Sequence, residues 1–263
     1  MRRPIGSLLS ILVLLLGSSS VDAATTIGAG SNLNFGDALV DFGCQDLIVA
    51  GHADGTTESL RSIANLSISG GGSLALGAGS VSLGGDFVDA GSLVPGTSRF
   101  AIVDACGHGT SQVSGAANFY DFLVTTANGK QLVLPASVTQ TIVHALTFQG
   151  VAGNPLNIVS SSGGVHALLA VNAAATQTID YVNARDNTAS AATIAPGTPA
   201  QYRSVDAGGL INWFGGAVGV GTASTVPAPL FDMLGRAALL LGLLLVAALT
   251  NSTACKAGFR TRP

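Results

Sequence analysis

Short runs of alternating polar and apolar residues, each closed by glycine, are the feature of this sequence that most limits its fold. Residues 73–76 are followed by Gly77-Ala78-Gly79, and residues 80–83 by Gly84-Gly85. Apolar residues two apart lie on one face of a β-strand, and glycine accepts the positive φ angles of tight corners. Corners this close together predict a β-solenoid, in which each coil covers the hydrophobic face of its neighbour.

The expected solenoid occupies residues 24–215 and is all-β, like a right-handed parallel β-helix. A β-sandwich, which needs longer strands, is the alternative. Trp213 and Phe214 are large enough to cover the open end of the stack, and residues 216–229 have the composition of a flexible linker. Further candidate strands are residues 119–124, 131–134, 142–143, 146–148, 156–159, 167–171 and 179–182.

Composition excludes two classes of protein. Of the 263 residues, 10% are charged and 48% are hydrophobic, which is the reverse of a disordered chain. Eleven Lys and Arg against 14 Asp and Glu leave no basic footprint for a nucleic acid.

The N-terminus has the pattern of a secretory signal peptide. Arg2 and Arg3 give a positive start, and residues 8–16 form a short apolar stretch. Small residues at Val21 and Ala23 predict cleavage after Ala23. The apolar stretch is shorter than the ~20 residues that span a bilayer, which argues against a permanent anchor.

The C-terminus has a different pattern, that of a membrane tail covering residues 230–263. A transmembrane helix is expected over about residues 230–250, after the proline-containing lead-in of residues 225–229. By the positive-inside rule, the basic end beyond it stays in the cytoplasm. Its basic residues are Lys256, Arg260 and Arg262.

This tail resembles the C-terminal sorting signals called IPTL-CTERM. Val226-Pro227 and Gly235 fit that pattern, and Asp232 stands where those signals have Glu. The tryptophan of the pattern is absent, and the spacing is longer. The resemblance implies processing or transient anchoring by the export and sorting machinery of a Gram-negative bacterium.

The body is similar to bacterial exported β-strand-repeat proteins of adhesin-like character. The similarity covers most of residues 60–215 and rests on composition and strand order. It implies a location at the cell surface and gives no catalytic residues to carry over. The segments that carry it are residues 81–87, 91–98, 100–104, 114–120, 129–130, 146–150, 160–162 and 206–215.

Two of the three cysteines, Cys44 and Cys106, lie in the part that would reach an oxidising compartment, whereas Cys255 lies in the tail. One disulfide between Cys44 and Cys106 is the simplest interpretation. Two buried free thiols are the alternative.

One motif imitates a serine protease. Gly107-His108-Gly109-Thr110 resembles the histidine motif of subtilisin-like enzymes, and Ser224 lies in a loosely similar nucleophile motif. A triad also needs an aspartate and an oxyanion donor in fixed positions. No suitable aspartate motif precedes His108, and Ser224 lies in the linker, so we expect no protease.

Metal-binding patterns are also missing from the sequence. The histidines at positions 52, 108, 144 and 166 are scattered, without the spacing of a metal site. Asp180, Asp186 and Asp206 could bind Ca²⁺ if neighbouring coils stack them, but turn residues in contact with solvent are the simpler interpretation. No cofactor is expected.

Two functions follow from these patterns. The first is a non-catalytic structural or adhesive protein of the cell surface or extracellular matrix, with an exopolysaccharide or a neighbouring cell as partner. The second is a carbohydrate-active enzyme on the same scaffold, which would need convergent acids; Asp180, Arg185 and Asp186 are its only local cluster.

Overall fold

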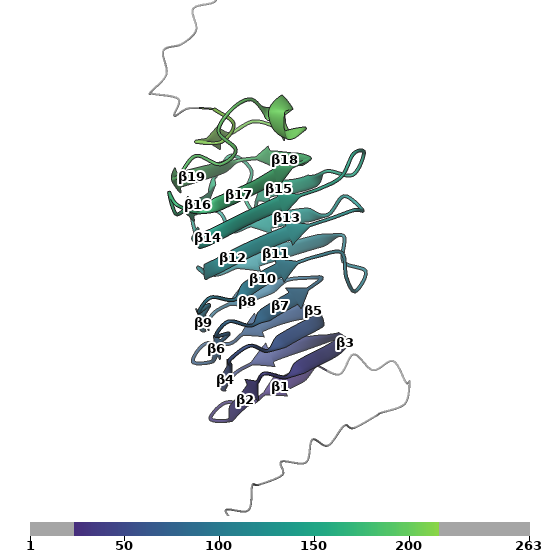
Figure 1. Ribbon diagram of the computed structural model, residues 1–263, viewed down its shortest axis with the longest axis vertical. Coiled ribbons are helices and arrows are strands. Elements are labelled where there is room, and N and C mark those ends of the chain that lie inside the picture. Colours follow the sequence, from purple (N-terminus) through teal and green to yellow (C-terminus); the bar gives the residue numbers. More distant parts are fainter. Residues whose placement is uncertain (1–23, 216–263) are drawn as a thin grey trace, which may run out of the picture. The chain divides into compact units, whose positions relative to one another are not determined.

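A computed structural model describes residues 24–215, and these residues form a parallel β-solenoid of about eight turns (Figure 1). The all-β solenoid expected from the alternating runs is confirmed, and the β-sandwich alternative is wrong. The predicted signal peptide, linker and sorting tail, with Val226, Pro227, Asp232 and Gly235, lie outside the described residues. Between residues 24 and 215, no helix has the length and apolar character needed to cross a bilayer.

Each complete coil has three strand positions, which we call faces 1, 2 and 3 in chain order. Face 1 contains β1 (Thr25–Ile27), the second halves of β3 (Leu39–Val49) and β5 (Ser59–Ile68), β8 (Phe87–Asp89), β11 (Thr110–Ser114), β13 (Gln131–Leu134), β15 (Leu156–Ser160), β18 (Val182–Arg185) and β20 (Val205–Asp206). Face 2 contains β2 (Asn32–Gly36), β4 (His52–Gly55), β6 (Ser73–Ala75), β9 (Ser92–Val94), the first halves of β12 (Asn118–Thr125) and β14 (Thr139–Gln149), β16 (Ala167–Val171), β19 (Asn187–Ala191) and β21 (Leu210–Ile211). Face 3 contains the first halves of β3 and β5, β7 (Ser80–Leu83), β10 (Arg99–Ile102), the second halves of β12 and β14, and β17 (Thr176–Asp180).

All named strands pair in parallel with the coils above and below. Val40, Leu60 and Val81, for example, are register partners in three successive coils. Strands β3, β5, β12 and β14 are longer than the sequence pattern suggests, because they continue around a corner. Register shifts occur at these corners, as at Ser62, whose φ is 53°. A bulge of this kind bends the strand without ending it.

The core consists of the inward-facing residue of each alternating pair. In β15 and β16 every second residue is buried. Aromatic rings line the middle of the core, and Phe119 and Phe122 stack with centroids 4.3 Å apart. Trp213 is 5% exposed and stacks on Phe148 at 6.4 Å, and Phe214 packs against the core beside it. The 3-10 helix η1 (Pro199–Tyr202) lies between β19 and β20.

Candidate functional site: a stapled corner and a polar groove

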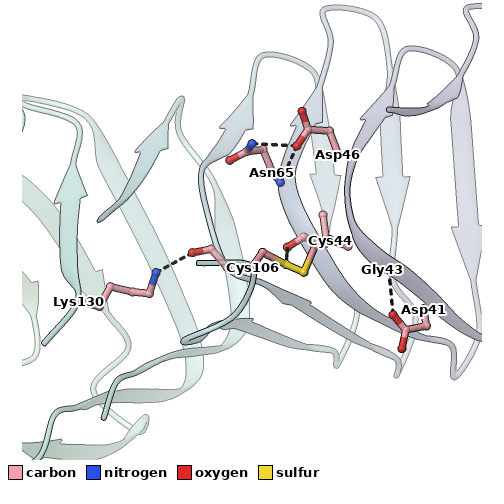
Figure 2. Close-up of a disulfide and its surroundings, with 9 residues drawn as sticks. Asp41, Gly43, Cys44, Asp46, Asn65, Cys106 and Lys130 are labelled. Atoms are coloured by element: carbon pink, nitrogen blue, oxygen red, sulfur yellow. Dashed lines mark hydrogen bonds between the residues drawn. A yellow bond between two sulfur atoms is a disulfide. The ribbon is translucent and has the colours of Figure 1, made fainter. Parts of the chain in front are cut away.

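The edge where each coil turns from face 3 to face 1 carries the disulfide, and we call it the disulfide corner. Cys44 and Cys106 are bonded, with their Cα atoms 5.2 Å apart (Figure 2). The predicted pairing is therefore confirmed. Two intermediate turns of the solenoid, at Asn65 and Gly84, separate the cysteines along this edge. The bond thus crosses several coils rather than joining neighbours.

The disulfide forms because the loop of residues 103–109 folds back over the preceding turns. Cys44 and Cys106 both have left-handed φ angles, 66° and 55°. The Cys106 Sγ lies 3.8 Å from the carbonyl oxygen of Ile63. A side chain on Gly84 would collide with the carbonyl oxygen of Ala105, so the loop can pass over this turn only because Gly84 has none.

A ladder of side-chain to backbone hydrogen bonds runs along the same corner. Asp46 Oδ1 accepts from the Asn65 backbone N–H at 3.0 Å, and Asn65 Oδ1 accepts from the Asp86 N–H at 2.7 Å. Asp86 Oδ1 then accepts from the Gln112 N–H at 2.8 Å. Each rung satisfies a backbone donor that the turn would otherwise leave unpaired.

Lys130 is the only lysine among the described residues, and it is 1% exposed. Its Nζ donates to the carbonyl oxygens of Gly84 and His108, both at 2.6 Å, and to Ser111 Oγ at 3.1 Å. Burial lowers the pKa of Lys130, and the nearby Asp104 carboxylate opposes this change. All three donors of the ammonium are used. Lys130 therefore holds the folded-back loop, and its nitrogen is not available as a nucleophile.

A shallow polar groove runs over face 1 along β11, β13, β15 and β18, which stack one above another in Figure 1. Thr110, Gln131, Asn157 and Asn183 are successive register partners at its floor. Asn183 Nδ2 donates to Asn157 Oδ1 at 3.1 Å, so these two amides form a ladder. Val159 and Arg185 line the groove beside them, and no described Asp or Glu does so.

The aspartates that the sequence offered for Ca²⁺ are held in separate contacts. Asp180 pairs with Arg203, whose Nε is 2.8 Å from Asp180 Oδ1. Asp186 accepts from the Gly164 N–H at 3.1 Å and lies 3.5 Å from Arg185 Nε. Asp206 closes its own turn by accepting from the Gly208 N–H. Within residues 24–215, no three His, Cys, Asp or Glu side chains gather as a metal site would require.

Three of the four histidines bond to a neighbouring coil. The Nδ1 atoms of His52, His144 and His166 lie 2.7 Å from Ser73 Oγ, Asp121 Oδ1 and Thr188 Oγ1 respectively. His108, from the protease-like motif, lies in the folded-back loop, where its carbonyl oxygen accepts from Lys130. Ser224 lies outside the described residues.

Sequence reasoning missed both Lys130 and the amide ladder. A lone lysine in a charge-poor body is a weak signal of burial. The amide ladder has a stronger signal in the sequence. The spacing from Gln131 to Asn157 equals that from Asn157 to Asn183 and matches the length of one coil in this part of the solenoid.

Comparison with known proteins gave no match to a family model, to a curated protein or to a solved structure.

Proposed function

We propose that this chain is an exported, non-catalytic structural or adhesive protein of a Gram-negative cell surface or extracellular matrix. The observation that carries the proposal is the Cys44–Cys106 disulfide, which clamps several coils of a single solenoid. Structural disulfides persist in oxidising compartments and are rare in the cytosol. A clamped stack of coils is a stiff, extended scaffold with broad faces.

The surface of the solenoid also supports this function. Its ionic contacts are few and dispersed, for example Arg61 with Asp41 at 3.1 Å and Arg203 with Asp180. The groove on face 1 is shallow and lined by amides, which suits repeated contacts with a polymer. Removing residues 1–23 at the predicted cleavage site would leave every strand of the solenoid in place.

Cell fractionation with mapping of both termini of the mature protein tests the proposal. We expect a mature N-terminus at Ala24, and Cys44 and Cys106 resistant to alkylation until reduction. We also expect the segment after Val226-Pro227 to anchor the chain transiently through about residues 230–250, or to be removed by the sorting machinery. A cytosolic protein that retains Met1 and reactive thiols would contradict export.

The non-catalytic part of the proposal needs its own experiment. Incubation of the purified protein with polysaccharides should release no products. Product release that Asp180→Asn or Asp186→Asn abolishes would instead establish a carbohydrate-active enzyme, the alternative expected from the sequence.

A further inference from the structure

We propose that the groove along β11, β13, β15 and β18 binds an acidic polysaccharide that runs parallel to the solenoid axis. This inference rests on the proposed surface function and names its ligand class. The floor of the groove is the register column Thr110, Gln131, Asn157 and Asn183. Parallel coils repeat about every 4.8 Å, so the column spans roughly 14 Å. This repeat is close to the length of one sugar ring in an extended glycan.

The free hydrogen-bonding capacity of the groove matches sugar hydroxyl groups. The Gln131 amide and the Thr110 hydroxyl make no side-chain hydrogen bond within residues 24–215, whereas Asn157 and Asn183 bond to one another. An amide both donates and accepts, as a hydroxyl does, so the two pair in either direction. Val159, in the next column, offers an apolar contact for the C–H face of a sugar.

Arg185 determines the charge of the ligand. Its side chain is 55% exposed, and its one ionic contact within the described residues joins Nε to Asp186 at 3.5 Å. The two terminal nitrogens of the guanidinium are left over, and they form a fork that fits a carboxylate. No described Asp or Glu lines the groove, and the nearest carboxylates in sequence, Asp186 and Asp206, directly follow Arg185 and precede Ala207 at its border.

Two loops lie at the ends of β15, one of the four strands that carry the groove. The loop before β15 contains the bridge between Val151 and Asn154, and Asn154 Nδ2 donates to the Ala127 carbonyl at 2.9 Å. The loop after β15 is held by the hydrogen bond from the Gly164 N–H to Asp186. Both loops are therefore anchored before any ligand arrives, which lowers the entropic cost of binding.

The test uses the protein as recovered from the cells that produce it and two fluorescent probes, an oligogalacturonate and a neutral cello-oligosaccharide. We expect the oligogalacturonate to bind more tightly and its affinity to fall with added salt. Gln131→Ala with Arg185→Ala should weaken that binding at least about tenfold, as the loss of a charge-assisted contact plus a neutral hydrogen bond predicts.

The matched control is Gln149→Ala with Arg99→Ala, which removes an exposed amide and an exposed arginine from face 3. This control should leave binding unchanged. Equal loss in both double variants, equal binding of the neutral probe, or no binding of the oligogalacturonate would overturn the inference. Export without binding defeats only this inference. A cytosolic location, or cleavage of the bound probe, defeats only the proposed surface function.

Discussion

Glu58, the only glutamate of the chain, lies in the corner that leads from β4 to β5 and is 1% exposed. Neither of its carboxylate oxygens has a hydrogen-bond partner within the described residues. Side chains on Gly55 or Gly79 would collide with its carboxyl group, so two glycines make room for it. Burial raises the pKa of Glu58 above 4.5, and the nearby Asp37 raises it further.

This raised pKa predicts a pH-dependent effect of Glu58→Gln. Between the unfolded and folded pKa values, the folded chain holds a proton that the unfolded chain has released. The contribution of Glu58 to stability is therefore present below pH 4.5 and is lost as the pH rises through the folded pKa. Glutamine has the same shape and does not ionise. We expect Glu58→Gln to stabilise the protein at pH 7 by on the order of 1 kcal/mol.

Thermal unfolding between pH 4 and pH 8 measures this effect. The gain should disappear below pH 4.5. Thr56→Ser, at an exposed position in the same corner, changes no ionisable group and is the control, which should show no such trend. A gain that is independent of pH would mean that the pKa of Glu58 is the same in the folded and the unfolded protein, which would contradict the effect of burial.

At the scale of elements, the disulfide corner joins loops that the strand ladders leave apart. The loop of residues 103–109 is held at its middle by the disulfide of Cys106 and near its C-terminal end by the Lys130 ammonium, which donates to the His108 carbonyl (Figure 2). The disulfide closes a loop with a sequence separation of 62 residues. Coils in a solenoid contact only their neighbours, so this long-range link adds a connection that the fold itself does not provide.

Replacing both cysteines, Cys44→Ser with Cys106→Ser, should therefore destabilise the N-terminal coils most. Chain-entropy arguments for a loop of this length predict a loss of about 4 kcal/mol in unfolding free energy. Hydrogen exchange should show faster opening of β1 to β5 than of β13 to β18. Cys255→Ser is the control. Uniform exchange in the double variant would show that the link does not hold the N-terminal coils in particular.

Gly84→Ala tests the folded-back loop without touching sulfur. The added methyl group meets the Ala105 carbonyl oxygen, so the loop must lift away from the corner. We expect a loss of about 2 kcal/mol or more, because buried backbone contacts and the Lys130 bond to Gly84 are disturbed together. We also expect a smaller fraction of this variant to form the disulfide, which alkylation and mass spectrometry would measure. Gly163→Ala, where a Cβ meets nothing, is the matched control.

For the solenoid as a whole, the chain of aromatic rings connects the middle coils. Phe119 is fully buried, lies 5.1 Å from Phe100 and stacks on Phe122, with distances measured between ring centroids. Phe119→Ala should cost about 3–5 kcal/mol, the usual range for removing a buried ring. Each coil is stabilised by its contacts with the coils next to it. Weakening the middle coils should therefore let the two ends of the solenoid unfold at different temperatures. Calorimetry would show a broadened or divided transition, and Leu33→Ala, at an exposed site, should leave one transition. A single sharp transition in Phe119→Ala would contradict this coupling.

The kind of fold and the residues that face the inside of the solenoid follow from the amino-acid pattern alone. Strand alternation places each side chain inside or outside the solenoid, whatever the length of the coil. The alternating runs therefore predict the observed burial of Leu74, Val81 and Leu83. The cysteine pair was readable as well, because only Cys44 and Cys106 lie outside the predicted tail.

Which residues meet across coils follows from the three-dimensional fold and cannot be read from the amino-acid pattern. Coil length varies with the corner loops, so alternation does not tell which residue of one coil stacks on which residue of the next. That register determines three features of the structure. They are the hydrogen bond between Asn157 and Asn183, the acceptors around the Lys130 ammonium, and the glycines that lie against the Glu58 carboxyl. The register depends on the lengths of all the corner loops and on the bulges within the strands. It is therefore fixed only when the strands of neighbouring coils pair.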